Sequence, residues 1–183
     1  MIINFFKHLH KINTHRFKVF VLCCKCGIPF RGLMHDLSKY SPIEFFEGVK
    51  YYTNGKHSPI IDCKKQNGYS KAWLHHKGRN KHHSEYWLDL AAPTKAPIIP
   101  FKYSVEMICD KIAASKTYNG KKYTNMSAYY YWNKNRDNEI MNRKIQGFIT
   151  EVLELLGAYG EKKVLNKKYL LDIYNKHVKR KGN

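Results

Sequence analysis

The sequence predicts an all-α protein built as a single helical bundle. Apolar residues recur every three or four positions in several segments, no β-type alternation is sustained, and Pro and Gly turn signals separate the segments. A length of 183 residues with 43% hydrophobic content suffices for one core. We therefore expect one domain over residues 1–183, with a site region at 14–118 and C-terminal helices over 127–179.

The first predicted helix covers residues 14–26, where Thr14 is a candidate N-cap and Gly27 stands where helices commonly end. A second helical piece begins near Phe30 and ends close to the pair His35-Asp36, with Leu37 as its last apolar position. Adjacent residues on a helix point about 100° apart, so this pair can serve one site near a helix end.

The third helix has a clear start signal. Ser41 is a candidate N-cap, Pro42 stands at the first helical position, and Glu44 completes a capping-box pattern, which predicts a helix over 42–52. Two Asn-Gly pairs and a Ser-Pro follow, so we expect residues 53–69 to form a long surface loop placed as a lid over the site.

Ser70 opens the next predicted helix, which runs to about residue 88 and carries one face of aromatic and polar residues: Trp73, His76, Asn80, His83 and Trp87. The prolines of "AAPTKAPIIP" interrupt the chain. A helix over 102–118 then places Glu106 and Asp110 on one face, and further helices are expected over 127–132, 138–159 and 167–179.

Composition limits the partners. A formal charge of +19 favours anionic partners such as phosphates, nucleotides or nucleic acid, although the lysines are scattered and a solvated surface explains them equally well. The five cysteines are an odd number in a chain without a secretory signal, which indicates a reducing cytoplasm. No apolar run is long enough to span a membrane, and the basic end "KHVKRKGN" is expected to be solvated.

The distinctive feature is a series of histidines and aspartates in successive predicted helices. Imidazole and carboxylate suit divalent manganese, iron or zinc, so the series predicts a site for one or two such ions. The candidate ligands are His15, His35, Asp36, His76, His82, His83 and Asp110.

This arrangement resembles the HD-domain metal-dependent phosphohydrolases: a lone His, a His-Asp pair within "HDLSK", further histidines and then a lone Asp. The resemblance implies a first metal held by His15, His35, Asp36 and Asp110. It implies a second metal held by some of His76, His82 and His83. The segments "HDLSK", "HHKGRN" and "EMICD" also resemble a family of uncharacterised bacterial and phage proteins over about residues 14–118.

The expected function is therefore hydrolysis of a nucleotide or another phosphoester at a metal centre. Lys39 and Arg79 are the cations expected at the phosphate, and Asp36 is counted with them as catalytic. Glu44 or Glu106 is expected to orient a ligand histidine.

Two other functions stay open: a basic protein that binds nucleic acid without catalysis, and an HD-like iron oxygenase. A nuclease-like use of "HHKGRNKHH" is disfavoured, because that motif spreads over a strand pair and a helix. Cys23 and Cys26 are expected to serve core packing, and the aromatic run "AYYYW" is expected to pack in the core or at an interface.

Overall fold

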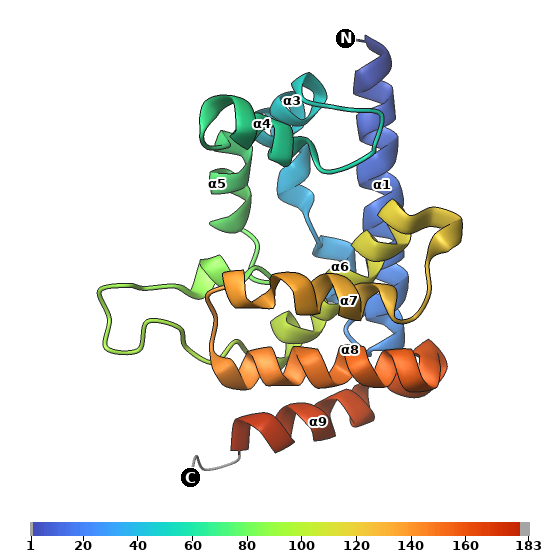
Figure 1. The fold of residues 1–183 in the computed structure, drawn as a ribbon, viewed down its shortest axis with the longest axis vertical. Coiled ribbons are helices and arrows are strands. Elements are labelled where there is room, and N and C mark those ends of the chain that lie inside the picture. Colours follow the sequence, from blue (N-terminus) through green and yellow to red (C-terminus); the bar gives the residue numbers. More distant parts are fainter. Residues whose placement is uncertain (1, 180–183) are drawn as a thin grey trace.

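The computed structural model describes residues 2–179, and every regular element within them is helical. Figure 1 shows α7, α8 and α9 stacked at one end of the molecule, while α1 runs from that end to the other, where α3, α4 and α5 lie. The α-helices are α1 (Ile2–Lys25), α2 (Pro29–Met34), α3 (Pro42–Lys50), α4 (Pro59–Asn67), α5 (Lys71–Lys77), α6 (Phe101–Asn119), α7 (Ser127–Asn135), α8 (Arg143–Val164) and α9 (Lys167–Lys179). The predicted all-helical class is confirmed for these residues.

The main core lies where α1, α6, α8 and α9 meet. Its members are fully or almost fully buried and include Leu22, Ile108, Ile112, Phe148 and Leu153. Each such side chain contributes about 1.5–3 kcal/mol through burial. The core fixes α6 against α1, and it therefore fixes the position of every α6 side chain that faces the site.

The start predicted for the first helix at Thr14 is wrong, because α1 begins at Ile2. The extra turns are held by tertiary contacts, since Ile12 of α1 is buried with Phe45 and Val49 of α3. Amphipathic packing of this kind stabilises helices more than local caps do.

The predicted long loop over 53–69 is also wrong, because α4 occupies Pro59–Asn67. Ser58 stands at its N-cap, Pro59 at its first helical position, and Gly68 ends it in a left-handed conformation with φ 78°. The Ser-Pro pair is therefore a helix start, a position where the fixed φ of proline is favourable.

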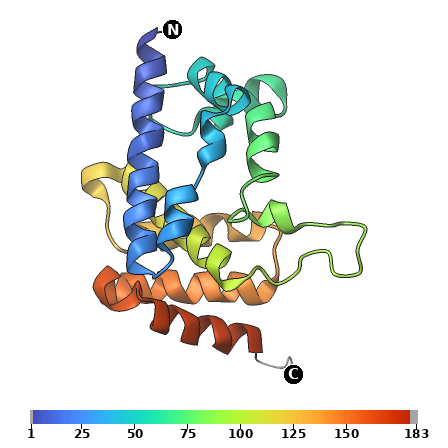
Figure 2. The same cartoon turned by 180° about the vertical axis from the view of Figure 1, so that it is seen from behind.

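The helix predicted from Ser70 to residue 88 is broken. It ends at Lys77, turns follow, and a short 3-10 helix covers Ser84–Trp87. The carbonyl of His76 accepts from the backbone N–H of Asn80 at 3.1 Å and from the side-chain amide of Asn80 at 2.8 Å, so both groups of Asn80 satisfy an acceptor at the end of this helix. The figures show the chain beyond this break leaving the body as a protruding loop before α6 (Figures 1 and 2).

Other expectations agree closely with the structure. The helices expected over 42–52, 102–118, 127–132 and 167–179 correspond to α3, α6, α7 and α9, and α8 begins five residues after its predicted start. The free thiols of Cys23 and Cys26 are buried in the core as expected. No helix within residues 2–179 is both long and apolar enough to cross a membrane. The last four residues of the predicted basic end lie outside the described residues.

Candidate metal centre

The candidate centre is built on His35 and Asp36, which interrupt the helical backbone between α2 and the next 3-10 helix, Leu37–Tyr40. His35 leaves the helix with φ −56° and ψ 129°, and Asp36 is left-handed with φ 53°. A left-handed conformation costs most residues about 1–2 kcal/mol, but aspartate tolerates it better than most. Arg16 holds the break, donating to the carbonyls of Leu33 at 2.8 Å and His35 at 2.7 Å. Both neighbouring side chains can therefore enter one site.

A first group of candidate ligands lies between α1, the segment after α2 and α6. His15 Nε2 is 2.9 Å from Asp110 Oδ1, and His35 Nε2 is 3.2 Å from Asp36 Oδ2 and 3.7 Å from Asp110 Oδ1. One ligand atom from each of His15, His35 and Asp36 falls within 4.8 Å of the others. The structure thus brings together all four residues that the HD resemblance implies for a first metal.

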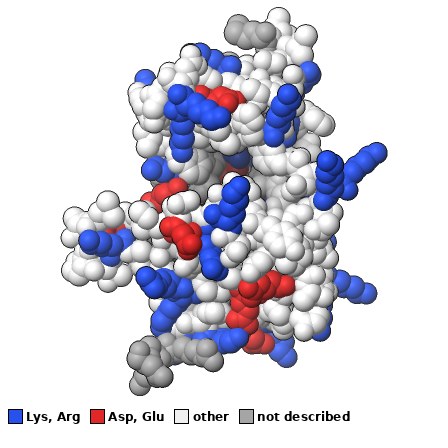
Figure 3. Space-filling model, viewed as in Figure 1, with Lys and Arg blue, Asp and Glu red and all other residues white. Residues whose placement is uncertain are grey.

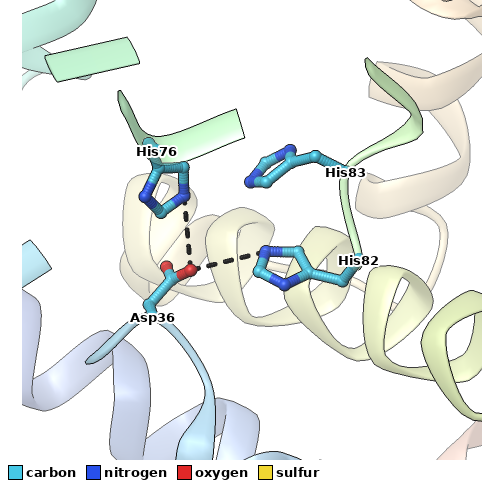
Figure 4. A group of neighbouring side chains, drawn as sticks. All are labelled: Asp36, His76, His82 and His83. Carbon is cyan, nitrogen blue, oxygen red and sulfur yellow. Dashed lines mark ion pairs between the residues drawn. The ribbon is translucent and has the colours of Figure 1, made fainter. Parts of the chain in front are cut away.

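A second group shares Asp36. Its Oδ1 atom lies 3.3 Å from His76 Nε2 and 3.4 Å from His82 Nε2. In Figure 4 the rings of His76, His82 and His83 gather around the space next to the Asp36 carboxylate. His35, His82 and Glu106 form a third set with ligand atoms equally close together. Asp36, His35 and His82 each belong to two of these overlapping sets.

Several ligand atoms are buried without a hydrogen-bond partner: His15 Nε2, His35 Nε2, Asp36 Oδ1, and both ring nitrogens of His82. They lie near opposite charges, as the distances above show, but their geometry does not make hydrogen bonds. An unsatisfied buried polar group costs about 1–3 kcal/mol. A cation among these atoms would remove that cost, so the residues present fit a divalent metal.

Two carboxylates, Glu44 and Glu106, contact the second ring nitrogen of imidazoles at the site. Glu44 lies 2.6 Å from Nδ1 of His75 and 2.7 Å from Nδ1 of His76. Glu106 lies 3.1 Å from His35 Nδ1. Metal-binding histidines usually donate their second N–H to such a partner. The expected arrangement of Glu44 and Glu106 is therefore present, and Glu44 is engaged here instead of in a capping box.

The carboxylates stay ionised at neutral pH. Burial would raise the pKa of Asp36, but the charges of His35 and Lys39 outweigh burial and hold it well below its usual range. Burial also opposes ionisation of Glu106, yet its contacts with His35 and His82 outweigh burial and lower its pKa to about 2. Ionised carboxylates are the form that binds cations.

The histidines differ in protonation. Burial lowers the pKa of His15, and burial with the charges of neighbouring histidines lowers the pKa of His83 well below its usual range. Burial also opposes the charged form of His35, but Asp36, Asp110 and Glu106 raise its pKa well above 6.5. Neutral imidazole is the ligand form, so metal binding here would displace the proton of His35.

The centre opens into a cavity of about 330 Å³, which Lys39 lines together with other site residues: His15, Asp36, His76, His83 and Asp110. The rest of its wall includes Lys11, Trp73 and Tyr118. Lys39 Nζ is 2.7 Å from Asp36 Oδ2, within reach of a bound anion, whereas Arg79 is exposed and does not line the cavity. The structure thus places the predicted Lys39 at the site but not Arg79.

Sequence reasoning missed His8, Arg16 and Arg31. His8 lines the cavity, and Arg31 donates to Glu106 at 2.8 Å. His8 falls before the predicted start of the first helix, so the sequence did not place it on the same helix face as His15, seven residues later. Neither arginine belongs to a local sequence pattern. Residues 57–60 of the predicted lid do line the cavity, although they lead into a helix.

The fold and the site define an all-α protein with a buried histidine–carboxylate cluster at one side of a cavity. The chain belongs to the Family of unknown function (DUF5662), whose model matches residues 4–155. The match extends beyond the 14–118 resemblance at both ends and includes part of α8. No curated protein and no solved structure matches the chain.

Proposed function

We propose that this protein is a metal-dependent phosphohydrolase that acts on a nucleotide or another phosphoester. One observation carries the proposal: buried ligand atoms without hydrogen bonds face one another beside a cavity that also holds Lys39. A structural metal would need no cavity, and a simple anion site would need no group of imidazoles and carboxylates.

The proposed ligands are those of the HD pattern. His15, His35, Asp36 and Asp110 would hold one divalent ion, and Asp36 with His76, His82 and His83 would hold a second. Their convergence from helices distant in sequence supports an HD-like centre. A bound divalent ion supplies a water nucleophile at neutral pH and offsets charge on phosphoryl oxygens.

The protein's own residues would bind and orient the ester. Lys39 would contact a phosphoryl oxygen as a point charge, and its pKa is raised because Asp36 and Asp110 outweigh the effect of burial. A cavity of about 330 Å³ is at the small end for ligand sites, which favours a small phosphoester. The free cysteines fit a reducing cytoplasm as its location.

The first test is elemental analysis of the untagged protein beside an Asp36→Asn variant. Asparagine keeps the left-handed backbone and the side-chain shape, so circular dichroism should be unchanged. We expect one or two equivalents of manganese, iron or zinc in the wild type and none in the variant. Hydrolysis of p-nitrophenyl phosphate should disappear with the metal. A wild-type protein that binds no offered divalent ion would refute the proposal.

The same measurement separates the other candidates. Redox-active iron without phosphatase activity would indicate the oxygenase, since the same ligand types suit iron. A nucleic-acid-binding protein would bind DNA or RNA with a steep loss on added salt and no effect of Asp36→Asn. Figure 3 shows Lys and Arg at separate places over this face of the molecule, without one continuous stripe.

A further inference from the structure

His57 and Asp62 form an ion pair beside the cavity that none of the proposed ligand sets includes. His57 Nε2 lies 2.7 Å from Asp62 Oδ2, and His57 lines the cavity. His57 precedes α4 and Asp62 lies in its first turn, so the helix start fixes both residues. The pair is partly exposed and outside the core.

The pair has the geometry of a proton donor held by a carboxylate. Asp62 accepts a hydrogen bond from Nε2 of His57. The other ring nitrogen of His57, Nδ1, has no partner among the described residues and is free to act on a bound molecule. Histidine is a common proton donor in catalysis, so a histidine held in this way has the geometry of a general acid.

The position of His57 suits the leaving group of a phosphoester. Lys39 and five of the seven predicted ligands line the same cavity as His57, and a space of about 330 Å³ allows one small molecule to contact both sides. Of the cavity's other histidines, His15, His76 and His83 belong to the ligand sets or contact them. Burial and the charge of Lys39 lower the pKa of His8 to about 4, so His8 is neutral and a poor acid.

We propose that His57 is the general acid of the phosphohydrolase and that Asp62 is its positioning residue. The inference rests on the proposed function. As the bond from phosphorus to the ester oxygen breaks, its electron pair stays on that oxygen, which takes the proton from His57 Nδ1. The attacking water gives its oxygen and one proton to the phosphate, and its second proton restores His57 through solvent. The products are an alcohol and hydrogen phosphate.

The test compares two esters that differ in their need for an acid. p-Nitrophenyl phosphate has a good leaving group, and glycerol 2-phosphate has a poor one. His57→Gln should lower kcat/KM for glycerol 2-phosphate by about 10²- to 10⁴-fold, the usual contribution of a general acid. The loss for p-nitrophenyl phosphate should be less than tenfold on the same scale. Metal content should not change.

The positioning role of Asp62 is tested by a measurement that would not change if Asp62 only stabilised the fold. Asp62→Asn should lower kcat/KM less than His57→Gln does, and again more for glycerol 2-phosphate than for p-nitrophenyl phosphate. The change should fall on kcat more than on KM. Asp62→Glu should restore part of the lost activity. The matched control is His177→Gln, which removes a histidine–carboxylate pair of the same 2.7 Å length, with Glu151, away from this cavity. Its kinetics should match those of the wild type.

The two proposals fail differently. Equal losses on both esters, or no loss, would overturn the role of His57 while the phosphohydrolase stands. A metal-loaded wild type that hydrolyses neither ester would overturn the proposed function, and the role of His57 with it. Loss of metal in His57→Gln would also overturn the inference, because His57 would then support the metal site.

Discussion

Lys39 Nζ lies 2.7 Å from Oδ2 of Asp36, while the other oxygen of that carboxylate faces His76 and His82 at 3.3 and 3.4 Å. One carboxylate therefore joins a cation in the cavity wall to the imidazoles behind it. Asp36 can bind metal through one oxygen while the other holds Lys39 in the position where a phosphate would contact it.

Lys39→Met keeps the length of the side chain but removes its charge. We expect bound metal to be retained and kcat/KM for p-nitrophenyl phosphate to fall by about 10²- to 10³-fold, as for loss of one preorganised donor. Lys65→Met, at an exposed position of α4, is the control and should have no effect. Unchanged hydrolysis by Lys39→Met would show that this ammonium does not contact the phosphate.

Asp36 belongs to two ligand sets, whereas His83 belongs to one. Asp36→Asn should therefore remove all bound metal, and His83→Gln should remove at most one equivalent. Elemental analysis of both variants beside the wild type measures the difference. Equal metal loss in both would mean that the sets do not act as separate sites.

Metal should stabilise the fold, because it satisfies buried atoms that otherwise lack partners. At a free concentration a thousandfold above Kd, a ligand that binds only the folded state adds about 4 kcal/mol. In a chain of this length that raises Tm by about 8–16 °C. Thermal unfolding after chelation and after return of each ion measures it, and identical Tm values would contradict the site.

Leu153 of α8 is fully buried in the core that fixes α6. Leu153→Ala should reduce the free energy of unfolding by about 2–5 kcal/mol through lost burial and the cavity left behind. Leu171→Ala on α9, where the leucine is 37% exposed, should cost about 1 kcal/mol or less. Urea unfolding of both variants tests the position of the core.

Glu161 of α8 accepts from Lys25 of α1 at 2.8 Å and also from Lys116 of α6. Burial would raise its pKa, but hydrogen bonds and charge from the two lysines lower it below its ordinary value of 4.5. The folded state thus binds the proton less tightly than the unfolded state, so the ion pairs stabilise the fold above about pH 4.5.

This stabilisation should disappear as pH falls through the lowered pKa of Glu161 in the folded protein. Unfolding of the wild type and Glu161→Gln should therefore differ at neutral pH and converge in acid. The exposed Asp172→Asn on α9 serves as control and should show a nearly constant difference from the wild type. A difference for Glu161→Gln that does not change with pH would contradict the assignment.

The helices that could be predicted from the sequence were those whose start residues and apolar spacing lie within the helix itself. The Ser41-Pro42 start of α3 and the apolar spacing of α6 lie within the segments themselves. The first turns of α1 could not be predicted in this way, because they depend on Phe45 and Val49 of α3. At the break after Lys77, the side-chain amide of Asn80 donates to Ser38 Oγ at 2.8 Å, a contact between segments that are distant in the sequence.

That break also decides the second ligand group. On a continuous helix, six residues separate His76 from His82, a rotation that would direct the two rings to different sides. Because the helix ends at Lys77, both imidazoles reach Asp36. The sequence could supply the candidate histidines but not this convergence, and it placed Arg79 at a site that the fold does not bring it to.

By itself, the sequence determined an all-helical chain, the residue types of a candidate metal centre and the helix end close to His35-Asp36, because helix periodicity, capping and ligand chemistry are local properties. Only the tertiary structure decided which side chains meet, that Glu44 and Glu106 orient the histidines, and that His57 shares the cavity. These are contacts between helices, and helix packing sets them through residues far apart in the chain.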